Sequence, residues 1–238
     1  MVVHCLPLVE LSAPLLLWLG GAGGLAPLYE YALGEAAFAR ERRLLCVNVE
    51  IPAHGEDVRE GEPRGVAGWA ARLAAGEDIC AWMAARVTAV VSHLIDTGRA
   101  DPACIILAGG SRTAFMALHC AAADPRIGAV IANKPMIDLL PLNEPKLMAA
   151  GSLACSLDLT AHAEAFAGKR LLVVIGAEDE RVGTDKTIEF ARLATRAGAE
   201  VDLHVVHHHE AVAGANGHNG VIPQSVELTQ AWLDRSVL

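Results

Sequence analysis

Short apolar runs alternate along the chain with longer segments that are rich in alanine and charged residues. The apolar runs, dense in leucine, valine and isoleucine, are predicted as strands at 15–19, 44–49, 105–108, 129–132, 171–175 and 201–206. The segments between and after them are predicted as helices at 28–40, 79–97, 113–123, 184–197 and 224–236. This alternation is typical of βαβ units whose parallel sheet is buried on both faces. The pattern therefore predicts an α/β protein.

Two segments interrupt the alternation. Residues 55–78 are rich in glycine, proline and charge, and residues 138–169 hold several prolines and no clean strand. Ligands of such folds bind outside the carboxyl ends of the parallel strands. We therefore expect both segments to border a site there, as loops or short helices.

The strand predicted at 105–108 leads into the most informative turn, which reads Ala-Gly-Gly-Ser-Arg-Thr-Ala at 108–114. A strand that turns sharply into a helix can hold one hydroxyl out for nucleophilic attack, and Ser111 is the candidate. Gly109 and Ala114 are small enough for such a turn. Thr113 stands where glycine is usual, so we expect its β-branched side chain to loosen or re-aim the turn. The alternative is an ordinary joint between strand and helix.

Acidic residues follow the strand predicted at 171–175. A carboxylate just past a strand end can reach the ring nitrogen of a histidine on a neighbouring loop, and Asp179 is the candidate. Asp138 is a rival, because it follows the strand predicted at 129–132. The other rivals, which can equally be solvated loop charges, are Glu178, Glu180 and Asp185.

Histidines gather after the last predicted strand. His218 lies between glycine-containing neighbours on a loop, where it can approach a serine without steric conflict. The consecutive histidines at 207–209 do not suggest a metal site, because neighbours in an extended segment point in alternate directions. His54 is expected to line the same cleft, and His119 to have a structural role inside a helix.

Ser111, Asp179 and His218 occur in the chain order of the α/β-hydrolases. Acyl transfer also needs oriented backbone N–H groups to stabilise the tetrahedral oxyanion. The glycine-rich segment 20–24 offers one donor at Gly21, with Ala22 as a rival, and the main-chain N–H of Arg112 offers the other. A dinucleotide or phosphate loop is the competing interpretation, but the segment matches neither glycine pattern.

Composition narrows the classes of partner and compartment. The 238 residues suit one domain, 1–238, and 19 basic against 28 acidic residues leave a net charge of −9. No basic run is interleaved with aromatics, so nucleic acid is not an expected partner. The six scattered cysteines form no Cys-x-x-Cys pair, which indicates reduced thiols in a cytoplasmic protein and no zinc site. The apolar N-terminus is predicted as a strand and not a signal peptide, and no membrane span is expected.

Several segments resemble a known group of enzymes. Residues 110–119 and 122–127 look like the Ser-Arg-Gly-Gly region of bacterial α/β-hydrolases of the prolyl oligopeptidase and dienelactone hydrolase type. Residues 178–184 and 217–218 look like the acid and histidine loops of the same group. The resemblance runs from about Pro14 to the C-terminus, and it implies a three-layer α/β/α sandwich, the α/β-hydrolase fold, with at most a short lid in 138–169. Thr113 and Ala114 replace the paired glycines of that group.

The resemblance also implies a serine hydrolase in which Ser111 attacks, His218 transfers the proton and Asp179 orients the imidazole, with no metal and no cofactor. We expect a carboxylesterase that cleaves small to medium acyl esters through an acyl-enzyme, because the chain is too short for the propeller domain of the oligopeptidases. A peptidase, amidase or thioesterase with the same triad is an alternative, and so is a non-catalytic protein of this fold. A small-molecule ester is the expected partner, and a homo-oligomer is left open.

Overall fold

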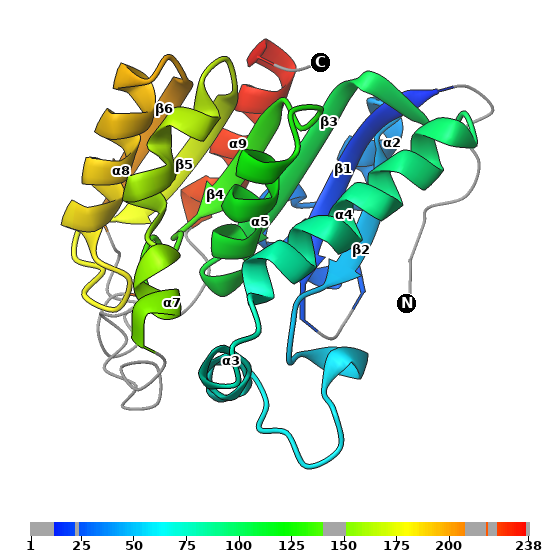
Figure 1. The fold of residues 1–238 in the computed structure, drawn as a ribbon. Coiled ribbons are helices and arrows are strands. Elements are labelled where there is room, and N and C mark those ends of the chain that lie inside the picture. The colour runs from blue at the N-terminus through cyan, green and yellow to red at the C-terminus, as the bar shows by residue number, and fades with distance from the viewer. Residues whose placement is uncertain (1–11, 22–23, 140–150, 208–217, 219–222, 237–238) are drawn as a thin grey trace.

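The computed structural model describes residues 12–21, 24–139, 151–207, 218 and 223–236. Within these residues, six parallel strands form one sheet (Figure 1). The strands are β1 (Ala13–Gly20), β2 (Leu45–Glu50), β3 (Ala100–Gly110), β4 (Ala129–Asn133), β5 (Arg170–Gly176) and β6 (Glu200–Val206). Each contains, or overlaps almost entirely, a run predicted as a strand, so the α/β prediction is confirmed.

Helices cover both faces of this sheet. The helices are α1 (Ala26–Leu28), α2 (Ala36–Glu41), α3 (Val66–Ala74), α4 (Ile79–Asp96), α5 (Arg112–Ala123), α7 (Gly151–Ser156), α8 (Thr184–Arg196) and α9 (Pro223–Ser236). A π-helix (Tyr29–Leu33) and two 3₁₀ helices (Gly55–Asp57 and Leu159–Phe166) complete the described elements. Figure 1 shows α4, α5 and α8 in front of the sheet and α2 and α9 behind it. This arrangement is the three-layer α/β/α sandwich that was expected.

Alternation along the strands builds a core on each side of the sheet. In β1, Leu15, Leu17 and Leu19 belong to the core under α4 and α5. The intervening Leu16 and Trp18 belong to the core under α2 and α9. Successive side chains of a strand point to opposite faces, so a continuous apolar run is what a sheet covered on both faces requires.

The strand order β2-β1-β3-β4-β5-β6 contains one point where the direction of growth reverses. The chain goes from β1 outward to β2, then returns to place β3 on the other side of β1, and the later strands follow outward from β3. The carboxyl ends of β1 and β3 therefore lie beside each other at a switch point, the usual ligand position of open α/β sheets. Residues 20–21 and 110–111 meet there.

The helix predicted at 28–40 is interrupted in the structure. Gly34 ends the π-helix with a φ of 73°, a conformation that glycine adopts without strain. A Cβ there would lie 2.9 Å from Cγ1 of Val226 on α9. Close packing against α9 therefore requires glycine at 34, and the helical periodicity on either side of it gave no sign of this contact.

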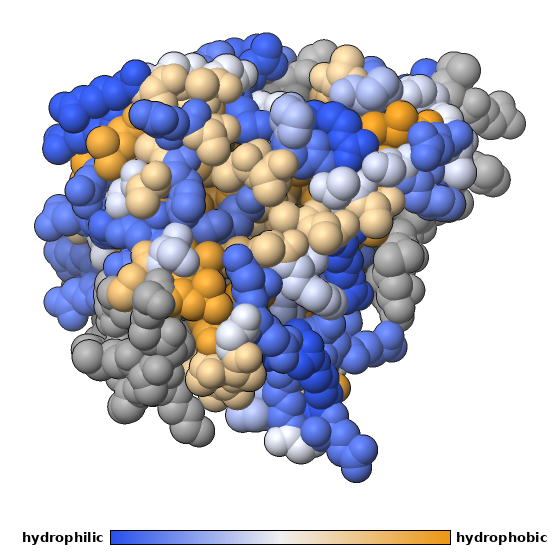
Figure 2. Space-filling model, viewed as in Figure 1, coloured by the Kyte–Doolittle hydropathy of each residue, from blue (hydrophilic) through white to orange (hydrophobic). Residues whose placement is uncertain are grey.

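The irregular segment 55–78 contains α3 and is anchored by buried charges. Arg72 of α3 forms ion pairs with Asp57 at 2.8 Å and Glu62 at 2.6 Å, and its own side chain is only 4% exposed. Arg86 of α4 reaches the same Asp57 at 3.3 Å. Hydrophilic residues cover much of the surface in this region (Figure 2). The pairs of Arg72 hold the segment together internally, and the pair of Arg86 with Asp57 attaches it to α4.

The helix α4 has the length and apolar composition of a membrane span. Several of its side chains, including Met83, Val87 and Val91, are buried in the core in front of the sheet. Its apolar character is thus accounted for by packing inside the fold. Residues 1–11 of the apolar N-terminus and residues 140–150 of the expected lid lie outside the described residues.

Candidate active site

Ser111 occupies the turn between β3 and α5. Its φ of 54° and ψ of −116° lie in a region that non-glycine residues seldom adopt. The Ser111 N–H donates to the carbonyl oxygen of Asn133 at the end of β4, at 2.8 Å, which holds the strained backbone in place. At Gly109 a Cβ would lie 2.5 Å from the carbonyl carbon of Thr113, so the turn requires glycine at that position.

Thr113 stabilises this turn, which differs from the expectation that it would loosen it. Its Oγ1 accepts a hydrogen bond from the Gly110 N–H at 2.7 Å and donates to the Gly110 carbonyl oxygen at 3.0 Å. Ala114 is fully buried in the core in front of the sheet. The sequence pattern showed the β-branched shape of Thr113. It did not show that the hydroxyl forms hydrogen bonds with the backbone of the turn.

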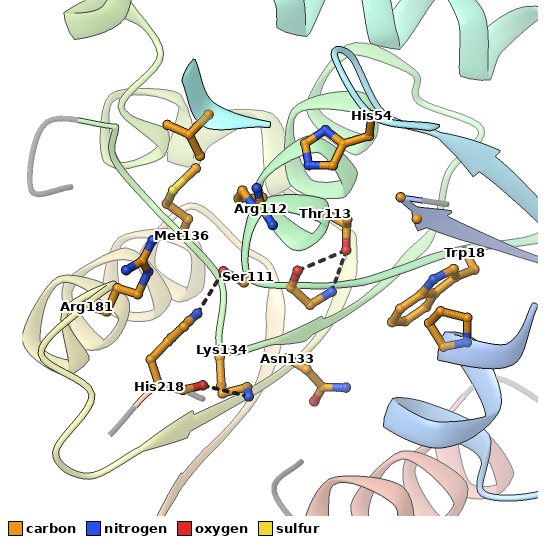
Figure 3. A pocket seen from close by; sticks show the side chains of 15 residues that line it. Trp18, His54, Ser111, Arg112, Thr113, Asn133, Lys134, Met136, Arg181 and His218 are labelled. Atoms are coloured by element: carbon orange, nitrogen blue, oxygen red, sulfur yellow. Dashed lines mark hydrogen bonds between the residues drawn. The ribbon is translucent and has the colours of Figure 1, made fainter. Parts of the chain in front are cut away.

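The structure brings Ser111, His218 and Asp179 together from three separate loops. The Nδ1 of His218 lies 2.8 Å from Oδ2 of Asp179, and its Nε2 lies 2.9 Å from Oγ of Ser111 (Figure 3). A carboxylate only accepts, so Nδ1 carries the hydrogen and Nε2 accepts from the serine hydroxyl. This is the arrangement in which an imidazole can take the serine proton.

Asp179 is held by the backbone of its own loop. Its Oδ1 accepts from the N–H groups of Arg181 and Val182, both at 3.1 Å. The carboxylate side chain is 0% exposed. With Oδ1 committed to two backbone donors, Oδ2 is left facing the imidazole, and the carboxylate cannot rotate freely.

The rival acids occupy other positions. Glu178 and Glu180 are exposed on either side of the buried Asp179, and Asp185 is exposed in the first turn of α8. Asp138 is half-buried after β4. Exposure alternates along the loop, so only Asp179 of the three consecutive acidic residues is buried. The sequence of the three residues alone does not reveal this difference.

Both predicted oxyanion donors face the same pocket as Ser111. Gly21 follows β1 and Arg112 opens α5, where the first N–H groups of a helix lack intrahelical acceptors. Within the described part of the chain, neither main-chain N–H donates a hydrogen bond. The rival donor Ala22 lies outside the described residues.

The pocket that contains these groups has a volume of about 530 Å³. It is lined by residues from the carboxyl ends of β1, β3 and β4 and from the loops around them (Figure 3): Trp18, Gly20, Gly21, Pro27, His54, Val66, Gly110, Ser111, Arg112, Thr113, Asn133, Lys134, Met136, Arg181 and His218. Its position at the switch point agrees with the site expected from the strand pattern.

The histidines other than His218 have different surroundings. His54 lines the pocket, as expected, and donates through Nδ1 to the carbonyl oxygen of Pro52 at 2.8 Å. Burial lowers the pKa of His54, so it is neutral around pH 7. His119 is buried in α5, with Nε2 3.1 Å from the carbonyl oxygen of Leu157. His207 is exposed, and residues 208–209 lie outside the described residues.

Lys134 is a site residue that sequence reasoning missed. It follows β4 with a φ of 47°, and its Nζ donates to the backbone oxygen of His218 at 3.0 Å (Figure 3). Its N–H donates to the carbonyl oxygen of Val174 at 2.6 Å, and burial lowers the pKa of its ammonium group. The available signal was the polar pair Asn133-Lys134 directly after an apolar strand.

Comparison of the sequence with protein-family models and with curated proteins finds no match. Solved structures do match by fold. An acetyl xylan esterase from Paenibacillus sp. R4 superimposes with a TM-score of 0.69 at 17% identity, over 99% of this chain and 80% of that one. The carboxylesterase Cest-2923 from Lactobacillus plantarum WCFS1 matches with a TM-score of 0.59 at 15% identity, over 98% of this chain and 90% of the esterase.

An acylaminoacyl peptidase from Pyrococcus horikoshii matches with a TM-score of 0.64 at 14% identity. The match covers 97% of this chain but only 38% of the peptidase. Together with the parallel strand order and the serine at the turn after β3, these matches define the class: the chain has the α/β-hydrolase fold. At these identities the likeness concerns the fold, and the chemistry depends on the site itself.

Proposed function

We propose that this protein is a serine hydrolase that cleaves carboxylic esters. The observation that supports the proposal is the hydrogen-bonded series Ser111, His218, Asp179, with 2.9 Å between serine and histidine and 2.8 Å between histidine and aspartate. The two main-chain N–H groups of Gly21 and Arg112 stand at the same pocket. A nucleophile, a base, an orienting acid and an oxyanion site are the parts that acyl transfer needs.

The proposed reaction has two steps. In the first, His218 Nε2 takes the Ser111 proton while Oγ attacks the ester carbonyl, and the N–H groups of Gly21 and Arg112 stabilise the oxyanion. His218 then protonates the departing alcohol, which leaves an acyl-serine. In the second step His218 takes a proton from water while the water oxygen attacks the acyl carbon. His218 then returns the proton to Ser111 Oγ as the bond between Oγ and the acyl carbon breaks and the acid is released.

The substrate class is proposed as small to medium acyl esters. The pocket volume of about 530 Å³ suits a ligand of that size. A peptidase, an amidase and a thioesterase would use the same groups. Comparing turnover of p-nitrophenyl esters with that of the matching anilides and thioesters distinguishes these reactions, because only the leaving group differs.

The central experiment combines active-site labelling with turnover. A fluorophosphonate probe should label Ser111, and Ser111→Ala should lower kcat for p-nitrophenyl butyrate by about 10³-fold or more. Alanine keeps the Cβ and hence the backbone strain at 111, so the variant should unfold near the temperature of the parent. Ser156→Ala, which alters an exposed serine on α7, is the matched control and should retain both labelling and turnover. Absence of labelling in the folded parent protein would favour a non-catalytic role.

A further inference from the structure

The charges that line the active-site pocket have the opposite sign to the protein as a whole. The chain has a formal net charge of −9. Among the described residues that line the pocket there are three cationic side chains, Arg112, Lys134 and Arg181, and no aspartate or glutamate. Asp179 lies behind His218 with no exposed surface. A cleft lined by one sign of charge concentrates ligands of the opposite sign.

Two of the three cations have no partner among the residues that the structure describes. Lys134 already donates to the backbone oxygen of His218. For Arg112 and Arg181, by contrast, no ion pair and no side-chain hydrogen bond is formed within the described part of the chain. Elsewhere in the fold, carboxylates raise the pKa of the arginines they pair with, as Glu62 does for Arg72.

The two guanidinium groups are close enough to repel each other. The pKa of Arg112 is lowered, first by burial and then by the charge of Arg181. Figure 3 shows both side chains on the same side of the pocket as Met136, beside Ser111 and away from Trp18. A half-buried cation next to a second cation is unfavourable unless an anion joins them.

The position of Arg112 is restrained by its neighbours. Its main chain follows the nucleophile directly, and its Nη1 packs against Gly65, where a Cβ would lie only 2.9 Å away. Arg181 comes from a different element, the loop whose backbone holds Asp179. The two guanidinium groups are thus carried by the elements that carry Ser111 and Asp179, so the fold fixes where their main chains lie relative to Ser111.

We propose that Arg112 and Arg181 form a subsite for a carboxylate carried by the ester substrate. The inference rests on the proposed esterase function and names its substrate class: acidic esters, such as the half-esters of dicarboxylic acids. A guanidinium group presents paired N–H donors that match the two oxygens of a carboxylate. A carboxylate between the two arginines also removes their mutual repulsion.

The test compares two substrates that differ in one charge. One is the p-nitrophenyl ester of adipic acid with its second carboxyl free, and the other has that carboxyl converted to the primary amide. The parent protein should show a kcat/KM at least about tenfold higher for the acid than for the amide, and added salt should reduce this ratio. The esters of glutaric and pimelic acids measure the reach of the subsite.

Single substitutions assign the preference to the two arginines. Arg181→Gln changes an exposed side chain and Arg112→Gln keeps the main-chain N–H, and each should lower the acid-to-amide ratio by about tenfold. Arg192→Gln, an exposed arginine on α8, is the control and should keep the parent ratio. A parent ratio near one, or a ratio that neither variant changes, overturns the carboxylate subsite.

The two proposals fail in different ways. Hydrolysis of p-nitrophenyl butyrate and of the amide ester without preference for the acid overturns the subsite and leaves the esterase. If no ester is hydrolysed and the fluorophosphonate does not label Ser111, both proposals are wrong.

Discussion

At the scale of single residues, the turn at Ser111 shows how a strained conformation is maintained. The backbone of Ser111 is held by Asn133, and the preceding Gly110 is held by the hydroxyl of Thr113. The departure from glycine at 113 therefore adds two hydrogen bonds at the point where the backbone is least relaxed. The side chain that the usual pattern disfavours is, in this chain, part of what keeps the turn at Ser111 in position.

This role leads to a prediction for Thr113→Val, which keeps the branched shape and removes the hydroxyl. The Gly110 N–H would lose its acceptor, so we expect the free energy of unfolding to fall by about 1–2 kcal/mol and kcat to fall with it. Urea unfolding and ester turnover measure the two effects. Thr113→Ser retains the hydroxyl and should stay near the parent in both; an equal loss in Thr113→Ser would show that the hydroxyl is not responsible.

At the scale of elements, the position of His218 depends on contacts with residues that follow two neighbouring strands, β4 and β5. Asp179 holds the imidazole from one side, and Lys134, after β4, holds the backbone oxygen of the same residue. Lys134 in turn is fixed to β5 through its N–H bond to Val174. The end of β4 therefore supports both Ser111, through Asn133, and His218, through Lys134.

We predict that Lys134→Met lowers kcat by about 10- to 100-fold, because His218, the proposed base, would transfer protons less efficiently when displaced by about 1 Å. KM should change little. Rates of ester turnover and of fluorophosphonate labelling measure the effect, and thermal unfolding shows that the variant is folded.

Lys169→Met is the matched control for this prediction. Lys169 is also a buried lysine with a lowered pKa, and its Nζ donates to the carbonyl oxygen of Ile127 at 2.7 Å, at the opposite end of the sheet. Both variants should lose stability, but only Lys134→Met should lose kcat. Equal losses of kcat would indicate that Lys134 acts on stability alone.

At the scale of the whole molecule, buried titratable groups make the folded state sensitive to acid. Burial lowers the pKa of His119 from 6.5 to about 4. As pH falls, the unfolded chain therefore binds a proton before the folded chain does, so the stability present above pH 6.5 is lost between pH 6.5 and about 4. Arg72 lowers the pKa of Glu62 from 4.5 to about 2. The contribution of Glu62 to the free energy of unfolding is therefore lost only as the pH falls below 4.5.

The prediction concerns His119→Gln, whose amide can still donate to the Leu157 carbonyl oxygen. Between pH 7 and about pH 5 the parent should lose about 2 kcal/mol more unfolding free energy than the variant, because only the parent protonates on unfolding. Urea unfolding at the two pH values measures the difference. His93→Gln, an exposed position on α4, is the control and should follow the parent; a parallel decline in all three proteins would contradict the assignment.

Much of this fold could be predicted because its causes are local. Apolar runs of strand length between alanine-rich helical segments identify a sheet buried on both faces, and all six described strands lie at predicted positions. Helix ends were less predictable: the break at Gly34 depends on contact with Val226, almost the whole chain away. The candidate triad was chosen from strand ends and chain order, but its catalytic role stays a prediction.

The sequence by itself determined the parallel α/β layering and the sharp turn at Ser111, since periodicity and small residues act over a few neighbouring positions. Only the tertiary structure decided which charges meet. Asp179 becomes the partner of His218 because the loop backbone buries it between exposed acids. Lys134, at the end of a neighbouring strand, donates to the backbone oxygen of His218, and the charge of Arg181 lowers the pKa of Arg112. Hydrogen bonding and electrostatic coupling depend on distance in space, and neighbouring strands bring together residues that the sequence keeps far apart.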